Sequence, residues 1–339
     1  MTLDQAVALS LVDTLSRPGL TARLRAPDPE LLEQAAPLLD RARALRARAA
    51  AGGIYVLPWN DPRVPMPLAA IGDCPPALWY RGDLACFQAP AVAIVGSRAA
   101  SAVALETADR LAADLAARGV VVVSGLARGV DSAAHRGALR TGRTVAVLGS
   151  GVDRIYPAEH EALAADVATG GLVMSEYPPG TPPLPFHFPM RNRLISGLCR
   201  AVVVIEASDK SGSLITAACA LEQGREVMAV PGNVLSGRNR GGHALIRDGA
   251  TIVECADDIV SELGLAPAPA GPAAARGSAD GSAASADPVL RRMEAGHAYD
   301  LDTLAGASGL DARRLLPRLA DLELRGLVRR VGGGRFMRP

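Results

Sequence analysis

"VVVVSGLARGVDSAAHRGALRTGRTVAVLGSG", from Val120 to Gly151, holds two uninterrupted apolar runs on either side of a segment with helical spacing. Apolar runs that do not alternate with polar residues indicate strands buried on both faces, which occur in parallel sheets covered by helices. Both runs end in Ser and Gly, where a parallel strand turns toward the next element. The stretch therefore predicts a strand–helix–strand unit of an α/β fold.

The same unit recurs on both sides of this stretch. "VAIVGS" precedes it, and "LVMSEYPPG", "AVVVIEAS" and "VMAVPGN" follow, most of them trailed by an Ala/Leu/Arg-rich helical segment. We expect a Rossmann-like, doubly wound parallel sheet over residues 58–265, including a proline-punctuated lead-in before residue 92. The common nucleotide fingerprints are missing, because no GxxxxGK[ST] occurs and "GSGVDR" has Arg154 where the dinucleotide motif needs its third glycine.

Three further segments flank the predicted sheet. Residues 1–57 read as a small helical domain, and residues 266–286 are so rich in Ala, Pro, Gly and Ser that we expect a flexible linker. Residues 287–339 show three helical segments, 287–296, 300–309 and 311–326, followed by two short strands around a tip at Gly332–Gly334. This order predicts a winged-helix domain.

Composition excludes several classes of protein. No run of about 18 apolar residues occurs, so we expect no membrane span. The N-terminus lacks a basic segment followed by a small-residue cleavage site, and we expect a cytoplasmic protein. The 5 cysteines are scattered without a CxxC pair, which predicts neither a disulfide framework nor a metal site, and we expect no cofactor. A net charge of +1 means that any nucleic-acid surface must be local.

The predicted strand ends carry a set of small and basic residues. Ligands of open α/β sheets bind outside the carboxyl ends of the strands, where helix N-termini favour anions. Arg98, Arg128 and Lys210 stand in these loops among Gly and Ser residues. "PFHFPMRNRLISG", residues 185–197, adds Arg191 and Arg193, whose planar forks fit phosphate or carboxylate. The residues alone leave open whether these arginines hold a free nucleotide, a nucleic-acid backbone or a neighbouring acid.

A catalytic set is not visible in the sequence. The 5 histidines fall in different units, and no nucleophile stands beside an oriented base. Asp131, Asp153 and Glu176 lie near predicted strand ends and are candidate bases, although for the two aspartates we favour turn capping. We therefore expect a binding protein and not an enzyme.

The C-terminal unit is locally basic. Residues 287–339 contain 10 arginines against 7 acidic residues. A winged helix places its third helix in the major groove and its tip on the backbone. A secondary contact with DNA or with a protein partner is expected at Arg313, Arg314, Arg318, Arg329, Arg330 and Arg335.

The ordered series "VGSR", "SGLARGVDSAAH", "VLGSGVDRIYP", "SEYPPGTPPLPFHFPMRNRLISGL", "EASDKSGSLITAACALEQGREVMAVPG" and "GGHALIRDGA" resembles the DNA-processing protein A family, DprA or Smf. The resemblance is dense from Pro58 to Gly264. It implies single-stranded DNA binding, a homodimer, and the protection of incoming strands and loading of the recombinase RecA during natural transformation. The N-terminal helices would match the family's helix-hairpin-helix or SAM-like domain.

Carried onto this chain, the resemblance implies a basic DNA-binding pocket. Phe186 or Phe188 would be its base-stacking residue, since stacking tolerates any base. The implied DNA-binding residues are Ser97, Arg98, Gly125, Arg128, Phe186, Phe188, Arg191, Asn192, Arg193, Lys210, Ser211, Gly212 and Ser213.

Two other functions remain as alternatives. The fold also resembles the lysine-decarboxylase-like nucleotide phosphoribohydrolases, whose "PGGxGTxxE" loop would correspond to "GSLITAAC", residues 212–219. If Thr216 matches the threonine of that motif, Cys219 occupies the place of the catalytic glutamate, which favours a binder. The C-terminal unit by itself would also fit a winged-helix transcription regulator with a ligand-sensing α/β domain.

Overall fold

The computed structural model describes residues 1–12, 18–26, 28–265, 287–294, 297–324, 327–331 and 335–338. The chain forms two compact units, Met1–Pro267 and Ala268–Pro339, and each is described by itself. The predicted linker, residues 266–286, lies outside the described residues.

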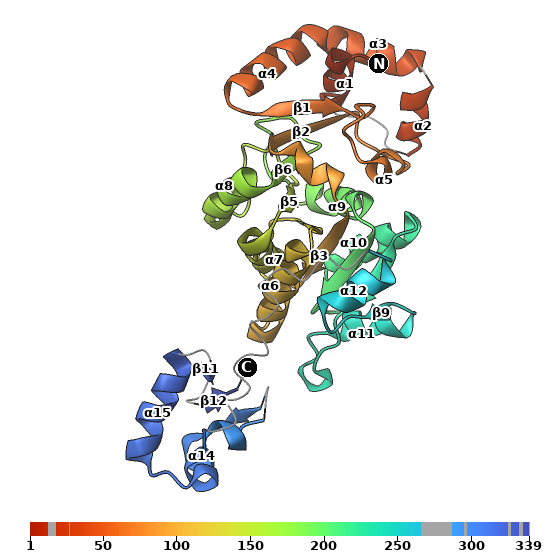
Figure 1. Ribbon diagram of the computed structural model, residues 1–339. Helices are drawn as coiled ribbons and strands as arrows, with labels where there is room; N and C mark the ends of the chain where they lie inside the picture. The colour runs from red at the N-terminus through yellow and green to blue at the C-terminus, as the bar shows by residue number, and fades with distance from the viewer. Residues whose placement is uncertain are drawn as a thin grey trace. The chain divides into compact units, whose positions relative to one another are not determined.

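The first unit is built on a nine-stranded sheet in the order β1-β2-β6-β5-β4-β3-β7-β8-β9 (Figure 1). The chain starts the parallel part at β3, builds outward to one side and then returns to build on the other side of β3. This reversal is the switch point of a doubly wound fold and confirms the predicted class. The parallel strands are β3 (Ala91–Gly96), β4 (Val121–Ser124), β5 (Thr144–Val147), β6 (Leu172–Ser175), β7 (Ala201–Ile205), β8 (Glu226–Ala229) and β9 (Thr251–Ile252).

The lead-in contributes two strands that the sequence did not predict. β2 (Ala77–Gly82) pairs antiparallel with β6, and β1 (Tyr55–Pro58) pairs antiparallel with β2. Most prolines of this region stand outside these two strands. They therefore lie in the segments that connect the strands, which extend the sheet. The predicted division between residues 57 and 58 falls inside β1.

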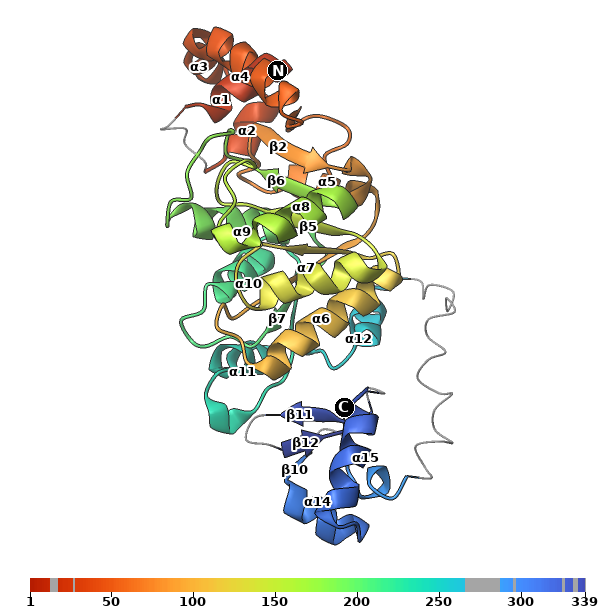
Figure 2. The same cartoon turned by 90° about the vertical axis from the view of Figure 1, so that its left-hand side faces the viewer.

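Helices cover both faces of the sheet. Along β3, Val92 and Ile94 pack in one apolar cluster, and Ala93 and Val95 pack in another, so the strand is buried on both sides. The Val92 cluster includes α6 (Ala102–Ala117), α7 (Val130–Thr141) and α12 (Ala256–Glu262), and Figure 2 shows α6 and α7 lying along that face. The opposite face is covered by α5 (Met66–Ala69), α9 (His187–Leu198), α10 (Ser213–Glu222) and α11 (Arg240–Arg247).

The N-terminal helices share a core with the sheet. Their apolar residues cluster with residues of β2, β5, β6 and α8 (Glu161–Gly170), among them Trp79, Ala146 and Val173. The helices are α1 (Leu3–Ser10), α2 (Leu20–Arg25), α3 (Pro29–Ala35) and α4 (Leu39–Ala51). Short 3-10 turns occur at η1 (Ala36–Leu38), η2 (Leu84–Gln88), η3 (Ala158–His160) and η4 (Val234–Ser236).

The second unit contains the predicted winged helix. Helices α14 (Leu301–Ser308) and α15 (Ala312–Leu324) pack on a three-stranded sheet of β10 (Ala298–Tyr299), β12 (Arg335–Met337) and β11 (Arg329–Val331), in that order. β10 was not predicted. The predicted helix at 287–296 was wrong over its described part, residues 287–294, where the only helical segment is the 3-10 turn η6 (Leu290–Arg292). The predicted tip at 332–334 lies outside the described residues.

Candidate nucleic-acid interface

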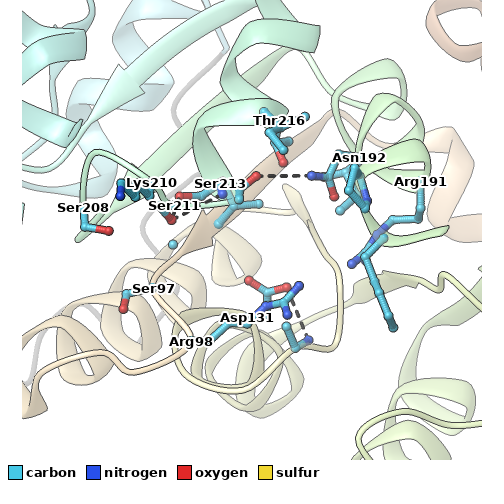
Figure 3. A pocket seen from close by; sticks show the side chains of 18 residues that line it. Ser97, Arg98, Asp131, Arg191, Asn192, Ser208, Lys210, Ser211, Ser213 and Thr216 are labelled. Carbon is cyan, nitrogen blue, oxygen red and sulfur yellow. Dashed lines mark hydrogen bonds between the residues drawn. The ribbon is translucent and has the colours of Figure 1, made fainter. Parts of the chain in front are cut away.

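A cavity of about 400 Å³ opens at the carboxyl ends of β3 and β7, beside the switch point of the sheet. Four segments line it: the loop after β3, the start of α7, the first turns of α9, and the loop that leads into α10 (Figure 3). Nine of the predicted DNA-binding residues line this cavity, namely Ser97, Arg98, Phe188, Arg191, Asn192, Lys210, Ser211, Gly212 and Ser213. Asp131, Ser208 and Thr216 also line it and were not predicted as ligand contacts.

Arg98 and Lys210 supply accessible positive charge to this pocket. Both side chains are exposed, and neither forms an ion pair with any residue that the structure describes. The guanidinium carbon of Arg98 lies 5.7 Å from the ring centroid of Phe188, a cation–π contact. The pocket therefore offers two cations from different loops to an incoming anion.

The loop before α10 supplies hydrogen-bonding groups. The hydroxyls of Ser211 and Ser213 lie 2.7 Å apart, and Thr216 follows one turn later. Asn192 donates from Nδ2 to the carbonyl of Gly212 at 3.3 Å, which ties α9 to this loop. The first amides of α10 are engaged locally, since the amide of Leu214 donates to the carbonyl of Ser211 and the amide of Ile215 donates to that of Gly212. The loop therefore offers its hydroxyls and Lys210 to a phosphate.

Arg191 forms the floor of the pocket. Its side chain is 3% exposed, and Nη1 donates to the carbonyl of Val147. Burial lowers the pKa of Arg191 to about 10, and the nearby carboxylate of Asp131 opposes this shift, so the guanidinium is charged at neutral pH. Gly125, a predicted DNA contact, lies behind this side chain and does not line the pocket. A Cβ at Gly125 would overlap Nη1 of Arg191.

Asp131 caps the turn that follows β4. It accepts hydrogen bonds from the amides of Gly125 at 3.0 Å and of Ala127 at 3.3 Å, which confirms the predicted capping. Burial raises its pKa, and Arg191 and the two amides oppose that shift. Asp131 is the one carboxylate among the described residues lining the pocket, and its oxygen is engaged by backbone amides.

Arg193 lies outside the pocket, although it is only two residues from Arg191. Its Nε is 2.7 Å from Oδ2 of Asp73, and its Nη2 is 2.8 Å from Oε2 of the buried Glu176. The sequence left open whether this arginine holds a free nucleotide, a nucleic-acid backbone or a neighbouring acid. The structure shows neighbouring acids. Asp73 was not anticipated as its partner.

Two other predicted contacts also stand away from the pocket. Arg128 forms an exposed, bidentate ion pair with Glu159 at 2.8 Å. Phe186 is 63% exposed as a residue, and its ring packs edge-on against that of His187, with centroids 4.5 Å apart. Phe188 is thus the predicted aromatic residue that the structure places at the pocket.

The other acidic candidates have structural partners. Asp153 accepts from the amide of Gly180 at 2.8 Å, as expected for turn capping, and Glu176 is paired with Arg193. Among the described residues, no group of three His, Cys, Asp or Glu side chains is arranged to hold a metal ion.

The predicted contacts of the winged helix differ in their surroundings. Arg313 and Arg314 are exposed on α15, and Arg330 and Arg335 are exposed on the strands, with Arg330 5.2 Å from the ring of Phe336. Arg318 instead pairs with the buried Asp287 at 2.5 Å and with Asp321 at 3.1 Å. Arg329 is half-buried on β11.

The sheet is doubly wound and has a phosphate-suited pocket at its switch point, and the chain also carries a winged helix. Together these features define a class of nucleotide- or nucleic-acid-binding proteins. The family model for DNA recombination-mediator protein A matches residues 55–264, and the model for the DprA winged helix domain matches residues 268–334. The chain belongs to the DNA recombination-mediator protein A family.

Known relatives agree with this assignment. The chain is 46% identical to DNA processing protein DprA of Streptococcus pneumoniae over 204 residues, 60% of this chain and 72% of the relative. It is 40% identical to protein Smf of Escherichia coli over 285 residues, 83% of this chain and 76% of the relative.

Solved structures of two DNA processing A proteins are similar to this chain. The S. pneumoniae structure matches with a TM-score of 0.68 and 34% identity, covering 77% of this chain and 98% of the other. The Helicobacter pylori structure, described as showing a single-stranded DNA binding mode, matches with a TM-score of 0.57 and 29% identity, covering 62% of this chain and 95% of the other.

No helix within the described residues is long and apolar enough to cross a membrane.

Proposed function

We propose that this protein binds single-stranded DNA at the pocket between β3 and β7 and acts as a recombination mediator. The observation that carries the proposal is the pairing of two exposed cations, Arg98 and Lys210, with a buried arginine floor and the hydroxyl-rich start of α10. Phosphates of a flexible strand would be held by these groups in any base sequence. The single-stranded DNA binding described for the H. pylori relative supports the same ligand.

The proposed DNA contacts are those that line the pocket. Arg191 would support the phosphate site from below, and Arg98 and Lys210 would contact the strand directly. Arg193 and Gly125 would act indirectly: Arg193 anchors the middle of α9 to Glu176 and Asp73, and Gly125 leaves room for the guanidinium of Arg191.

We infer that the bound strand is not cleaved by this pocket. Hydrolysis needs a nucleophile beside a base, and the lining carboxylate, Asp131, is engaged by two amides beside Arg191. If Thr216 on α10 matches the threonine of the phosphoribohydrolase motif, Cys219 takes the place of the catalytic glutamate, which also favours a binder.

The cellular role follows the family resemblance. We propose that the protein works in the cytoplasm as a homodimer, protects incoming single strands and loads RecA onto them during natural transformation. The helical region before residue 58 and the winged helix after residue 286 are proposed as accessory domains, and the exposed arginines of α15 as a secondary contact with DNA or a partner.

A binding experiment separates this proposal from its alternatives. Gel shifts would compare single strands of unrelated sequence, duplex DNA and a competing nucleoside monophosphate at several salt concentrations. We expect sequence-tolerant binding of single strands that weakens steeply with salt. Preferred binding of one duplex sequence would favour a transcription regulator, and displacement of the strand by low concentrations of the monophosphate would favour a nucleotide enzyme.

A further inference from the structure

Tyr156 lies beside Phe188, the aromatic residue of the pocket, on a loop that does not line the pocket. Its ring centroid is 5.4 Å from that of Phe188, and its side chain is 45% exposed. Phe188 comes from the start of α9, whereas Tyr156 comes from the loop after β5. Two aromatic residues from distant parts of the sequence therefore form one adjoining surface.

Phe188 is the less exposed aromatic residue of the pair. It is half-buried, and the guanidinium of Arg98 lies 5.7 Å from its centroid. It also packs against the loop after β5, since a Cβ at Gly149 would lie 3.0 Å from Cδ1 of Phe188. These contacts suit Phe188 to hold Arg98 and Tyr156 in place, and they leave Tyr156 as the more open aromatic of the pair.

A second cation, Arg128 of the loop after β4, is bound to the turn that follows Tyr156. The 3-10 turn η3 begins two residues after it, and Glu159 on that turn binds Arg128 through two hydrogen bonds of 2.8 Å. Arg128 itself is more than half exposed. Arg98 thus contacts Phe188, Phe188 contacts Tyr156, and Arg128 is bound to the turn that follows Tyr156.

Alternating cations and aromatic rings are the usual means of binding a single strand without reading its sequence, because arginines contact phosphates and every base has a face that can stack. We propose that Tyr156 is a base-stacking residue that extends the DNA path from the pocket, over Phe188, to the end of β5. The ligand chemistry is an unpaired base of a polynucleotide. This inference rests on the proposed function of the pocket.

The test compares a short and a long strand on four variants. The full-length protein would be titrated into labelled oligothymidylates of about 4 and about 12 nucleotides, and binding would be followed by fluorescence anisotropy. The two lengths lie within the common range of single-strand site sizes. We expect Tyr156→Ala to weaken binding of the long strand roughly 5- to 100-fold and to leave the short strand nearly unchanged, as loss of one stacked base predicts. Tyr156→Phe should retain wild-type affinity, because the ring remains.

Two control variants make the result specific. Tyr55→Ala removes an exposed aromatic from β1, an edge strand of the sheet that does not line the pocket, and should leave both affinities unchanged. Phe186→Ala tests the competing exposed ring. Equal affinity of wild type and Tyr156→Ala for the long strand, or a loss confined to Phe186→Ala, would overturn the inference while the pocket remains a DNA site. Failure of the wild-type protein to bind either strand would instead reject the proposed function itself.

Discussion

Nη2 of Arg193 lies 2.8 Å from Oε2 of Glu176, and both side chains are buried away from the pocket that Arg191 lines. One helix therefore uses two arginines, two residues apart, for different purposes. Arg191 lines the proposed DNA pocket, and Arg193 fastens α9 to the strand end at Glu176 and to Asp73.

Replacement of Arg193 should affect stability before it affects binding. Arg193→Met leaves the buried Glu176 carboxylate without its charged partner, so we expect the free energy of unfolding to fall by about 3 kcal/mol. Urea denaturation measures this loss. The folded variant should bind single strands nearly as the wild type does. A large loss of affinity with unchanged stability would show that Arg193 contacts the DNA.

Gly125→Ala should disturb the pocket without touching its lining. The added methyl group would overlap Nη1 of the buried Arg191, so the guanidinium must shift from the carbonyl of Val147. We expect single-strand affinity to drop about tenfold, as for loss of one charge-assisted contact. Gly72→Ala is the matched control, because Gly72 has open space around it. Wild-type affinity in Gly125→Ala would mean that the position of Arg191 is immaterial.

The buried His135 should make the protein less stable in acid. Burial, followed by the nearby charges of Arg191, His160 and Arg136, lowers its pKa to about 3. An unfolded histidine has a pKa near 6.5, so between these values the unfolded chain takes up a proton that the folded chain does not. Stability from this group is therefore complete above pH 6.5 and falls as the pH falls toward 3.

The size of this effect can be measured by urea denaturation at several pH values. Full coupling would change the free energy of unfolding by up to about 1.4 kcal/mol per pH unit within that window. His135→Gln removes the titrating group and should flatten this dependence. An unchanged pH profile in that variant would assign the acid sensitivity to other residues.

In the winged helix, Arg318 should behave as a structural residue. It binds the buried Asp287, which also accepts from the amides of Val289 and Leu290 at 2.8 and 3.2 Å. We expect Arg318→Ala to destabilise this unit by about 1–2 kcal/mol, raising amide hydrogen exchange at Leu304 and Leu319 roughly tenfold. Arg313→Ala is the control, since Arg313 is exposed on the same helix. Equal exchange in both variants would contradict this role.

Much of the fold could be predicted because its strands are continuous apolar runs. "VAIVGS" and "VVVVSG" are buried on both faces in β3 and β4, which is what such runs imply. β1 and β2 escaped prediction because prolines border them and because the pairing of β2 with β6 joins residues far apart in the chain.

The site was predictable at the level of loops and less so at the level of side chains. Parallel strands bring their carboxyl ends together, which placed Arg98, Arg191 and Lys210 at one pocket. The direction in which Arg193 points could not be inferred, because Asp73 is distant in sequence and nothing in "RNR" distinguishes its two arginines. Tyr156 was passed over since its neighbour Phe188 is adjacent only in space.

The most direct test of the pocket is the salt dependence of single-strand binding by the Arg98→Ala, Lys210→Ala double variant. Each phosphate contact with a cation contributes about −0.7 to the slope of log K against log salt for single strands. The loss of two contacts should therefore make the slope less negative by about 1.4 and weaken binding at low salt. A double variant of two exposed arginines elsewhere, Arg41→Ala with Arg110→Ala, should keep the wild-type slope. Wild-type slope and affinity in the Arg98, Lys210 variant would contradict the proposal that this pocket holds the DNA.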